Sequence, residues 1–136
     1  SSDPAQDILR FKLAGGKDFI VFNGPDEQFA AGRLLGADAG IGGTYGAMPE
    51  LYLKMDELIK RSEWEKAAEI QNIVTPLIYR LCSFPSMHGA VKGIITLDGC
   101  PMGDPRLPFL PVSVDDPDLK ALYQDIRKAV EETKEW

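Results

Sequence analysis

The sequence of 136 residues has little of what several classes of functional site require. It contains one histidine, His88, and no Cys-x-x-Cys pair, so it offers neither a zinc site of ordinary spacing nor a supported Ser-His-Asp or Cys-His mechanism. Its two cysteines, Cys82 and Cys100, could form a disulfide, but this sparse usage favours reduced thiols in a cytoplasmic protein. We therefore expect no metal site and no histidine-based catalysis.

The sequence also lacks a cluster of basic residues, a long apolar run and a first methionine. A net charge of −6 without a basic patch argues against nucleic acid and anionic membranes as partners. No apolar segment has the length of a membrane span, and no signal peptide is evident. The missing methionine indicates a processed start or a fragment. A hydrophobic fraction of 44% nevertheless supports a core of ordinary size.

The first third of the sequence alternates between helix and strand patterns. Asp3-Pro4 predicts the start of a helix that the glycines at 15 and 16 end. Residues 18–22 (DFIVF) predict a strand buried on both faces, as in a parallel sheet. Residues 25–35 predict a second helix, and residues 39–43 predict a glycine-rich second strand. This order is typical of repeated β/α units.

The remainder of the sequence predicts helices, and it suggests that the chain is part of a larger domain. The helices are expected over residues 49–61, 63–84 (with Trp64 on its buried side), 86–97 and 117–135, the last capped by Asp115-Asp116. Two short parallel strands cannot form a stable sheet alone, because their edges and faces stay uncovered. We divide the chain into residues 1–62, which hold the β/α units, and a helical extension over residues 63–136.

One stretch, FNGPDEQFAAGRLLGADAGIGGTYG at residues 22–46, combines features that suit a polar ligand better than a core. Adjacent carboxylates follow the first strand, and four glycines fall within residues 40–46 after the second. Carboxylates accept hydrogen bonds from hydroxyl groups, and glycines let the backbone approach a ligand closely. The simpler interpretation is that the two carboxylates only favour the first turn of a helix.

This stretch resembles the segment that spans the seventh and eighth barrel strands of the N-acetylneuraminate lyase and dihydrodipicolinate synthase family. The following helices and the tail at residues 106–113 (RLPFLPVS) extend the resemblance over nearly the whole chain. The resemblance implies an α/β fold: the C-terminal part of a (β/α)8 TIM barrel, with its last two strands and their helices, followed by a helical extension. Active sites of such barrels lie at the C-terminal ends of the strands.

The family resemblance also implies which residues bind substrate. Gly24, Asp26 and Glu27 would contact the hydroxyl groups of an open-chain 2-keto sugar acid, with help from the backbone of Gly42 and Gly43. Lyases that act on sialic acid usually carry serine where this chain has Gly43, so one hydroxyl contact is expected to be missing.

Two further interpretations of this stretch stay open. Gly42 and Gly43 could equally serve close packing of the strand against a helix. Thr44 and Tyr45 could be contacts at the barrel rim, and Tyr45 could equally pack between protomers.

The catalytic parts of the family are not found in this sequence. The family uses a lysine that forms an imine with pyruvate, and this lysine is expected just upstream of Ser1. Lys12, Lys17, Lys54 and Lys92 match no catalytic position. The resemblance implies no other cofactor and no metal. The expected partners are the N-terminal part of the same barrel, a small keto sugar acid and further copies of the chain in a tetramer.

Two other interpretations remain open at this stage. The enzyme could be a dihydrodipicolinate synthase or another 2-keto-3-deoxy sugar acid aldolase, because the tail at residues 106–111 resembles the synthases as well. The chain could also be a non-catalytic helical binding module that retains only the end of a barrel. A lysine on a companion segment would separate the enzymes from the binding module.

Overall fold

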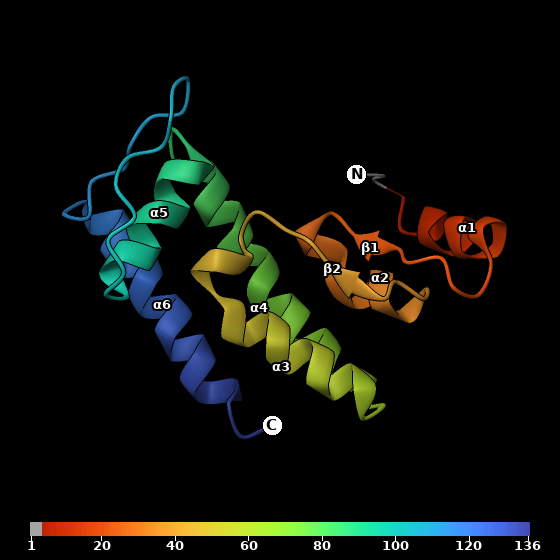
Figure 1. The fold of residues 1–136 in the computed structure, drawn as a ribbon. Coiled ribbons are helices and arrows are strands. Elements are labelled where there is room, and N and C mark those ends of the chain that lie inside the picture. Colours follow the sequence, from red (N-terminus) through yellow and green to blue (C-terminus); the bar gives the residue numbers. More distant parts are fainter. Residues whose placement is uncertain (1–3) are drawn as a thin grey trace.

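The computed structural model describes residues 4–136, so the expected helix cap Asp3 lies outside the described residues. A small α/β part, with α1 and the strand pair, lies at one side of the molecule, and the longer helices gather at the other (Figure 1). The elements in chain order are α1 (Gln6–Gly15), β1 (Phe22–Asn23), the 3₁₀ helix η1 (Asp26–Gln28), α2 (Phe29–Leu34), β2 (Ala39–Gly40), the 3₁₀ helix η2 (Tyr45–Ala47), α3 (Pro49–Lys60), α4 (Trp64–Ser83), α5 (Met87–Leu97) and α6 (Pro117–Thr133).

The two strands pair in parallel, with Phe22 opposite Ala39, which confirms the predicted β/α order. The predicted length and burial of the strands are wrong. Each strand has only two residues, and the side chains of Phe19, Ile20 and Phe22 are 51%, 69% and 52% exposed. Within residues 4–136 each strand has one neighbour, so most of the apolar run has neither a pairing strand nor a covering layer.

The predicted helices are confirmed in order, and they differ at some ends. α1 begins at Gln6 with Ala5 as its cap, two residues later than Pro4, and α6 ends at Thr133 rather than near residue 135. The second predicted helix opens as the 3₁₀ turn η1 and becomes α-helical only at Phe29. Trp64 was predicted on the buried side of α4, which is wrong, because at the first helical position its side chain is 38% exposed.

The core lies among α3, α4, α5 and α6, which pack against one another (Figure 1). Its most deeply buried large side chains are Met48, Leu51, Met55, Leu58, Ile70, Val74, Ile78, Leu81, Ile94, Leu119, Leu122 and Ile126. Side-chain caps help to set where α5 and α6 begin: Ser86 accepts from the Gly89 amide, and Asp116 accepts from the Asp118 amide. The helices α3 to α6 therefore carry most of the hydrophobic stabilisation of the chain.

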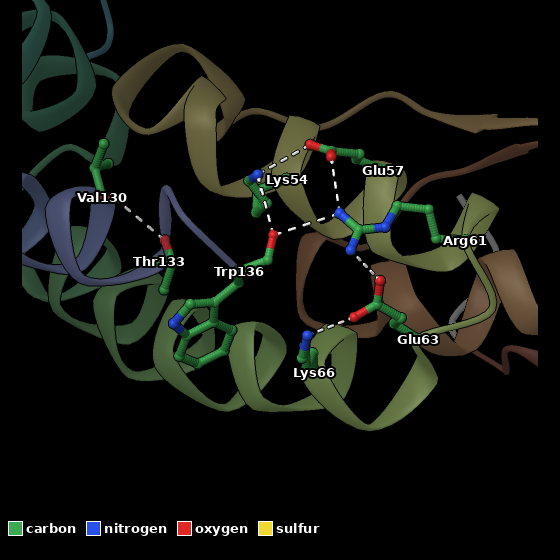
Figure 2. Close-up of polar contacts among 8 residues, drawn as sticks. All are labelled: Lys54, Glu57, Arg61, Glu63, Lys66, Val130, Thr133 and Trp136. Atoms are coloured by element: carbon green, nitrogen blue, oxygen red, sulfur yellow. Dashed lines mark hydrogen bonds and ion pairs between the residues drawn. The ribbon is translucent and has the colours of Figure 1, made fainter.

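The C-terminal residue Trp136, just beyond α6, is held against α3 by a polar network (Figure 2). Lys54 Nζ and Arg61 Nη1 each donate to the backbone oxygen of Trp136 at 3.5 Å. Both side chains also pair with Glu57, at 3.0 and 3.1 Å, and Arg61 reaches Glu63 as well. Because these groups lie near solvent, the network orients the helices more than it stabilises them. None of the helices within residues 4–136 is long and apolar enough to cross a membrane.

Candidate functional site

The residues expected to bind substrate lie just after the two parallel strands. Gly24, Asp26 and Glu27 follow β1, and Gly42 and Gly43 follow β2. Because the strands run in the same direction, both groups lie at one edge of the strand pair. The structure brings Asp26 and Gly42 into close contact, while the other three residues lie around this pair in different surroundings.

Asp26 is almost fully buried, with 7% of its surface exposed, and its carboxylate is held by Thr44. Asp26 Oδ2 accepts from the Thr44 amide at 2.9 Å and also from the Thr44 hydroxyl. The Thr44 hydroxyl in turn lies 3.0 Å from the hydroxyl of Tyr52, on α3. These contacts join the segment after β1 to the segment after β2, so they fix the relative position of the two halves of the site.

Gly42 is required by the position of the Asp26 carboxylate. A Cβ atom at Gly42 would lie 1.9 Å from Asp26 Oδ1 and 2.5 Å from the ring of Tyr45, far inside normal contact distance. Gly43 has much more room, because a Cβ there would meet only the terminal methyl of Met87, at 3.2 Å. The sequence left open whether these glycines serve a ligand or packing. The structure gives Gly42 a packing role and leaves Gly43 exposed.

Glu27 and Gly24 occupy more open positions than Asp26. The side chain of Glu27 is exposed, on the same 3₁₀ turn as the buried Asp26. Gly24 lines a cavity of about 260 Å³ between α1 and the strands, together with residues such as Phe22 and Gln28.

The electrostatic effect of the two carboxylates extends to a nearby cysteine. Burial raises the pKa of the Cys82 thiol, and the charges of Glu27 and Asp26 raise it further. The site is therefore acidic as well as polar.

Sequence reasoning missed three residues that build this site: Thr44, Tyr52 and Gln71. Thr44 was considered only as a contact at the barrel rim, and the other two lie within helices predicted from their apolar pattern. Gln71 on α4 donates to the backbone oxygen of Asp26 at 3.3 Å and accepts from the Ala30 amide at 3.0 Å. A polar side chain on the inner face of an amphipathic helix was the available signal, because such groups need buried partners.

Three aromatic rings pack beneath the site. The rings of Tyr45 and Tyr52 lie 3.9 Å apart, and Phe29 meets them edge-on at 6.0 and 5.7 Å. The sequence suggested that Tyr45 could equally lie at the rim or between protomers, whereas the structure packs its ring within the chain. Burial raises the pKa of both tyrosines well above the ordinary value, and the charge of Asp26 adds to the shift in each.

Alkaline solution is expected to destabilise the chain through these two tyrosines. Their pKa is about 10.0 when exposed and higher in the fold, so the folded state keeps protons that the unfolded state loses. The contribution of the two tyrosines to the free energy of unfolding should therefore be constant below pH 10 and fall as the pH rises above it. Thermal melts across this range check the prediction. A Tyr45→Phe variant should show a shallower decline, and an equal decline would contradict the assignment.

Three lysines, Lys12, Lys54 and Lys92, make structural contacts within the chain. Lys12 pairs with Asp38 at 2.9 Å, and Lys54 pairs with Glu57 at 3.0 Å. Lys92 donates to two backbone oxygens, both at 3.1 Å. Each of these ammonium groups is thus held by a partner within the chain. Within residues 4–136, no group of three histidine, cysteine or acidic side chains is placed to hold a metal ion.

Comparison with known proteins identifies the family of this chain. The Dihydrodipicolinate synthetase family matches residues 2–128. The N-acetylneuraminate lyase of Mediterraneibacter gnavus is 49% identical over 118 residues, which are 85% of this chain and 37% of that enzyme. The N-acetylneuraminate lyase of Rhizobium meliloti is 34% identical over 119 residues, or 88% of this chain and 38% of that enzyme.

Solved structures give the same relationship. The wild-type sialic acid aldolase of Ruminococcus gnavus superposes on 98% of this chain and 45% of its own, with a TM-score of 0.92 and 44% identity. The chain thus spans less than half the length of these relatives. Solved relatives are TIM-barrel aldolases, and a mostly helical chain with two parallel strands is consistent with a fragment of such a barrel. The chain belongs to the dihydrodipicolinate synthetase family.

Proposed function

We propose that this chain is the substrate-binding C-terminal portion of a Schiff-base-forming lyase. The complete enzyme would cleave a 2-keto sugar acid, N-acetylneuraminate in the first instance, to pyruvate and an aldehyde sugar. The observation that carries the proposal is the Asp26-Glu27 turn, locked against Gly42 and Thr44 beyond the ends of two parallel strands. Relatives named as N-acetylneuraminate lyases support the choice of substrate.

The site suits a polyhydroxylated chain better than an apolar ligand. Glu27 is exposed and can accept hydrogen bonds from two neighbouring hydroxyl groups. Thr44 fixes the orientation of the Asp26 carboxylate through Oδ2. Little entropy is therefore lost when a substrate hydroxyl donates to the other oxygen, Oδ1. Gly43 carries no side chain, which lets the backbone and solvent approach the same end of the ligand. In our proposal these residues orient the substrate and leave bond cleavage to another part of the barrel.

The nucleophile in this proposal is a lysine on the upstream part of the same barrel. Lys12, Lys54 and Lys92 already have charged or backbone partners, so none presents a free amine to the strand ends. The lysine would attack the keto group, and the protonated imine would take up the electrons released by carbon–carbon cleavage. The imine is itself the electron sink, so the proposed reaction needs no dissociable cofactor. Assembly as a tetramer stays a prediction.

Trapping with pyruvate and borohydride tests the proposal directly. The protein, isolated with every segment that accompanies this chain, should gain one reduced pyruvate adduct on an upstream lysine and none on residues 4–136. It should also release pyruvate from N-acetylneuraminate faster than from other 2-keto-3-deoxy sugar acids. Intact mass spectrometry and peptide mapping give the first result, and a coupled pyruvate assay gives the second.

The Glu27→Gln variant separates binding from chemistry in the same experiment. It should keep the adduct and lose at least about tenfold in kcat/KM, because an ionised acceptor is replaced by a neutral one. An adduct on Lys12, Lys54 or Lys92 would refute the upstream lysine. Absence of both adduct and cleavage would refute the lyase and favour a binding module.

A further inference from the structure

The Asp26 carboxylate is held by a series of hydrogen bonds that extends through Thr44 to Tyr52, on α3. A carboxylate only accepts, so the Thr44 hydroxyl must donate its single proton to Asp26 Oδ2. The lone pairs of Thr44 Oγ1 are then left to accept, and the hydroxyl of Tyr52, 3.0 Å away, is the donor. The order of donation therefore runs from Tyr52 to Thr44 to Asp26.

This series of hydrogen bonds leaves the Asp26 carboxylate with one orientation. Oδ2 is occupied by the amide and the hydroxyl of Thr44, and Oδ1 lies where a Cβ atom at position 42 would stand. The Tyr52 ring cannot swing away, because Tyr45 lies 3.9 Å from it and Phe29 meets its edge. Both Thr44 and Tyr52 are buried, at 2% and 4% exposed, so water does not compete for these bonds.

We propose that Thr44 and Tyr52 are positioning residues, which hold the Asp26 carboxylate in the direction that a substrate hydroxyl requires. The inference rests on the proposed lyase function and adds to it two residues that do not themselves touch substrate. Their effect is on the geometry of binding. The sugar acid should therefore bind less well without them, while imine formation with pyruvate continues.

Thr44→Val and Tyr52→Phe remove the two hydroxyls and little else. In the assembled protein each variant should raise KM for the sugar acid about tenfold, leave the KM for pyruvate near the wild-type value, and keep the borohydride adduct. Thr44→Ser restores the hydroxyl and should recover the wild-type KM within about twofold. Thr133→Val is the matched control, because the Thr133 hydroxyl is buried and donates only within α6.

Hydrogen exchange on the chain itself tests the positioning without any catalysis. The Thr44 amide donates to Asp26, so it should exchange faster in Tyr52→Phe than in the wild type, while amides of α6 keep their protection. An unchanged Thr44 amide together with an unchanged KM would overturn the inference. Equal losses in Thr44→Val and Thr133→Val would also overturn it, as general destabilisation. A wild-type protein without adduct or cleavage would instead refute the lyase function itself.

Discussion

Replacing Gly42 with alanine should destabilise the chain by about 3 kcal/mol, as the sum of an overpacking cost and the loss of charged hydrogen bonds. The new methyl would lie 1.9 Å from Asp26 Oδ1, so the carboxylate has to move away from Thr44. The neighbouring ring of Tyr45, at 2.5 Å, closes the other direction of escape. Urea denaturation of the purified variant measures the change, and the assembled enzyme should lose substrate binding in parallel.

Gly43→Ala is the matched control for this substitution, one residue along the chain. Its methyl would meet only the flexible end of Met87 at 3.2 Å, which can shift by a few tenths of an ångström. The free energy of unfolding should therefore stay within about 0.5 kcal/mol of the wild type. If the two variants proved equally stable, the contact between Gly42 and the Asp26 carboxylate would not be part of the fold.

Local sequence patterns predicted most of the helices, and the reason is physical. Helices such as α3 and α4 carry apolar residues at helical spacing and are stabilised by contacts among neighbouring helices. The strand at residues 18–22 was predicted too long, because an apolar composition shows only that a segment is able to form a strand. Pairing itself depends on neighbouring strands. Within residues 4–136 the only such neighbour is β2, which pairs over two residues.

The candidate site could be predicted only in part. Asp26 and Glu27 were visible as adjacent carboxylates after a strand, but the sequence did not show that one is buried and the other exposed. That difference depends on Thr44 and Tyr52, which lie 18 and 26 positions beyond Asp26 and reach it only in the fold. Gly42 was predicted as a ligand contact, whereas its lack of a side chain first serves to admit the carboxylate.

Placing charges on the exposed apolar face should abolish assembly of the proposed enzyme without unfolding this chain. The side chains of Phe19, Ile20, Phe22 and Ile41 are between 51% and 69% exposed, around strands that have free edges. In our proposal the upstream part of the barrel covers them. A double variant, Ile20→Lys with Phe22→Lys, should leave the unfolding free energy of the chain within about 0.5 kcal/mol of wild type per site.

The same variant should reduce sugar acid cleavage more than about a hundredfold, because assembly would bury two lysine ammonium groups without partners. Limited proteolysis should find the upstream part unprotected. Leu107→Lys is the control, since Leu107 is 85% exposed on the segment between α5 and α6, remote in sequence from the strands. Full activity in the double variant would mean that this face stays open to solvent. The upstream part of the barrel would then not pack on these strands, and the proposed assembly would be refuted.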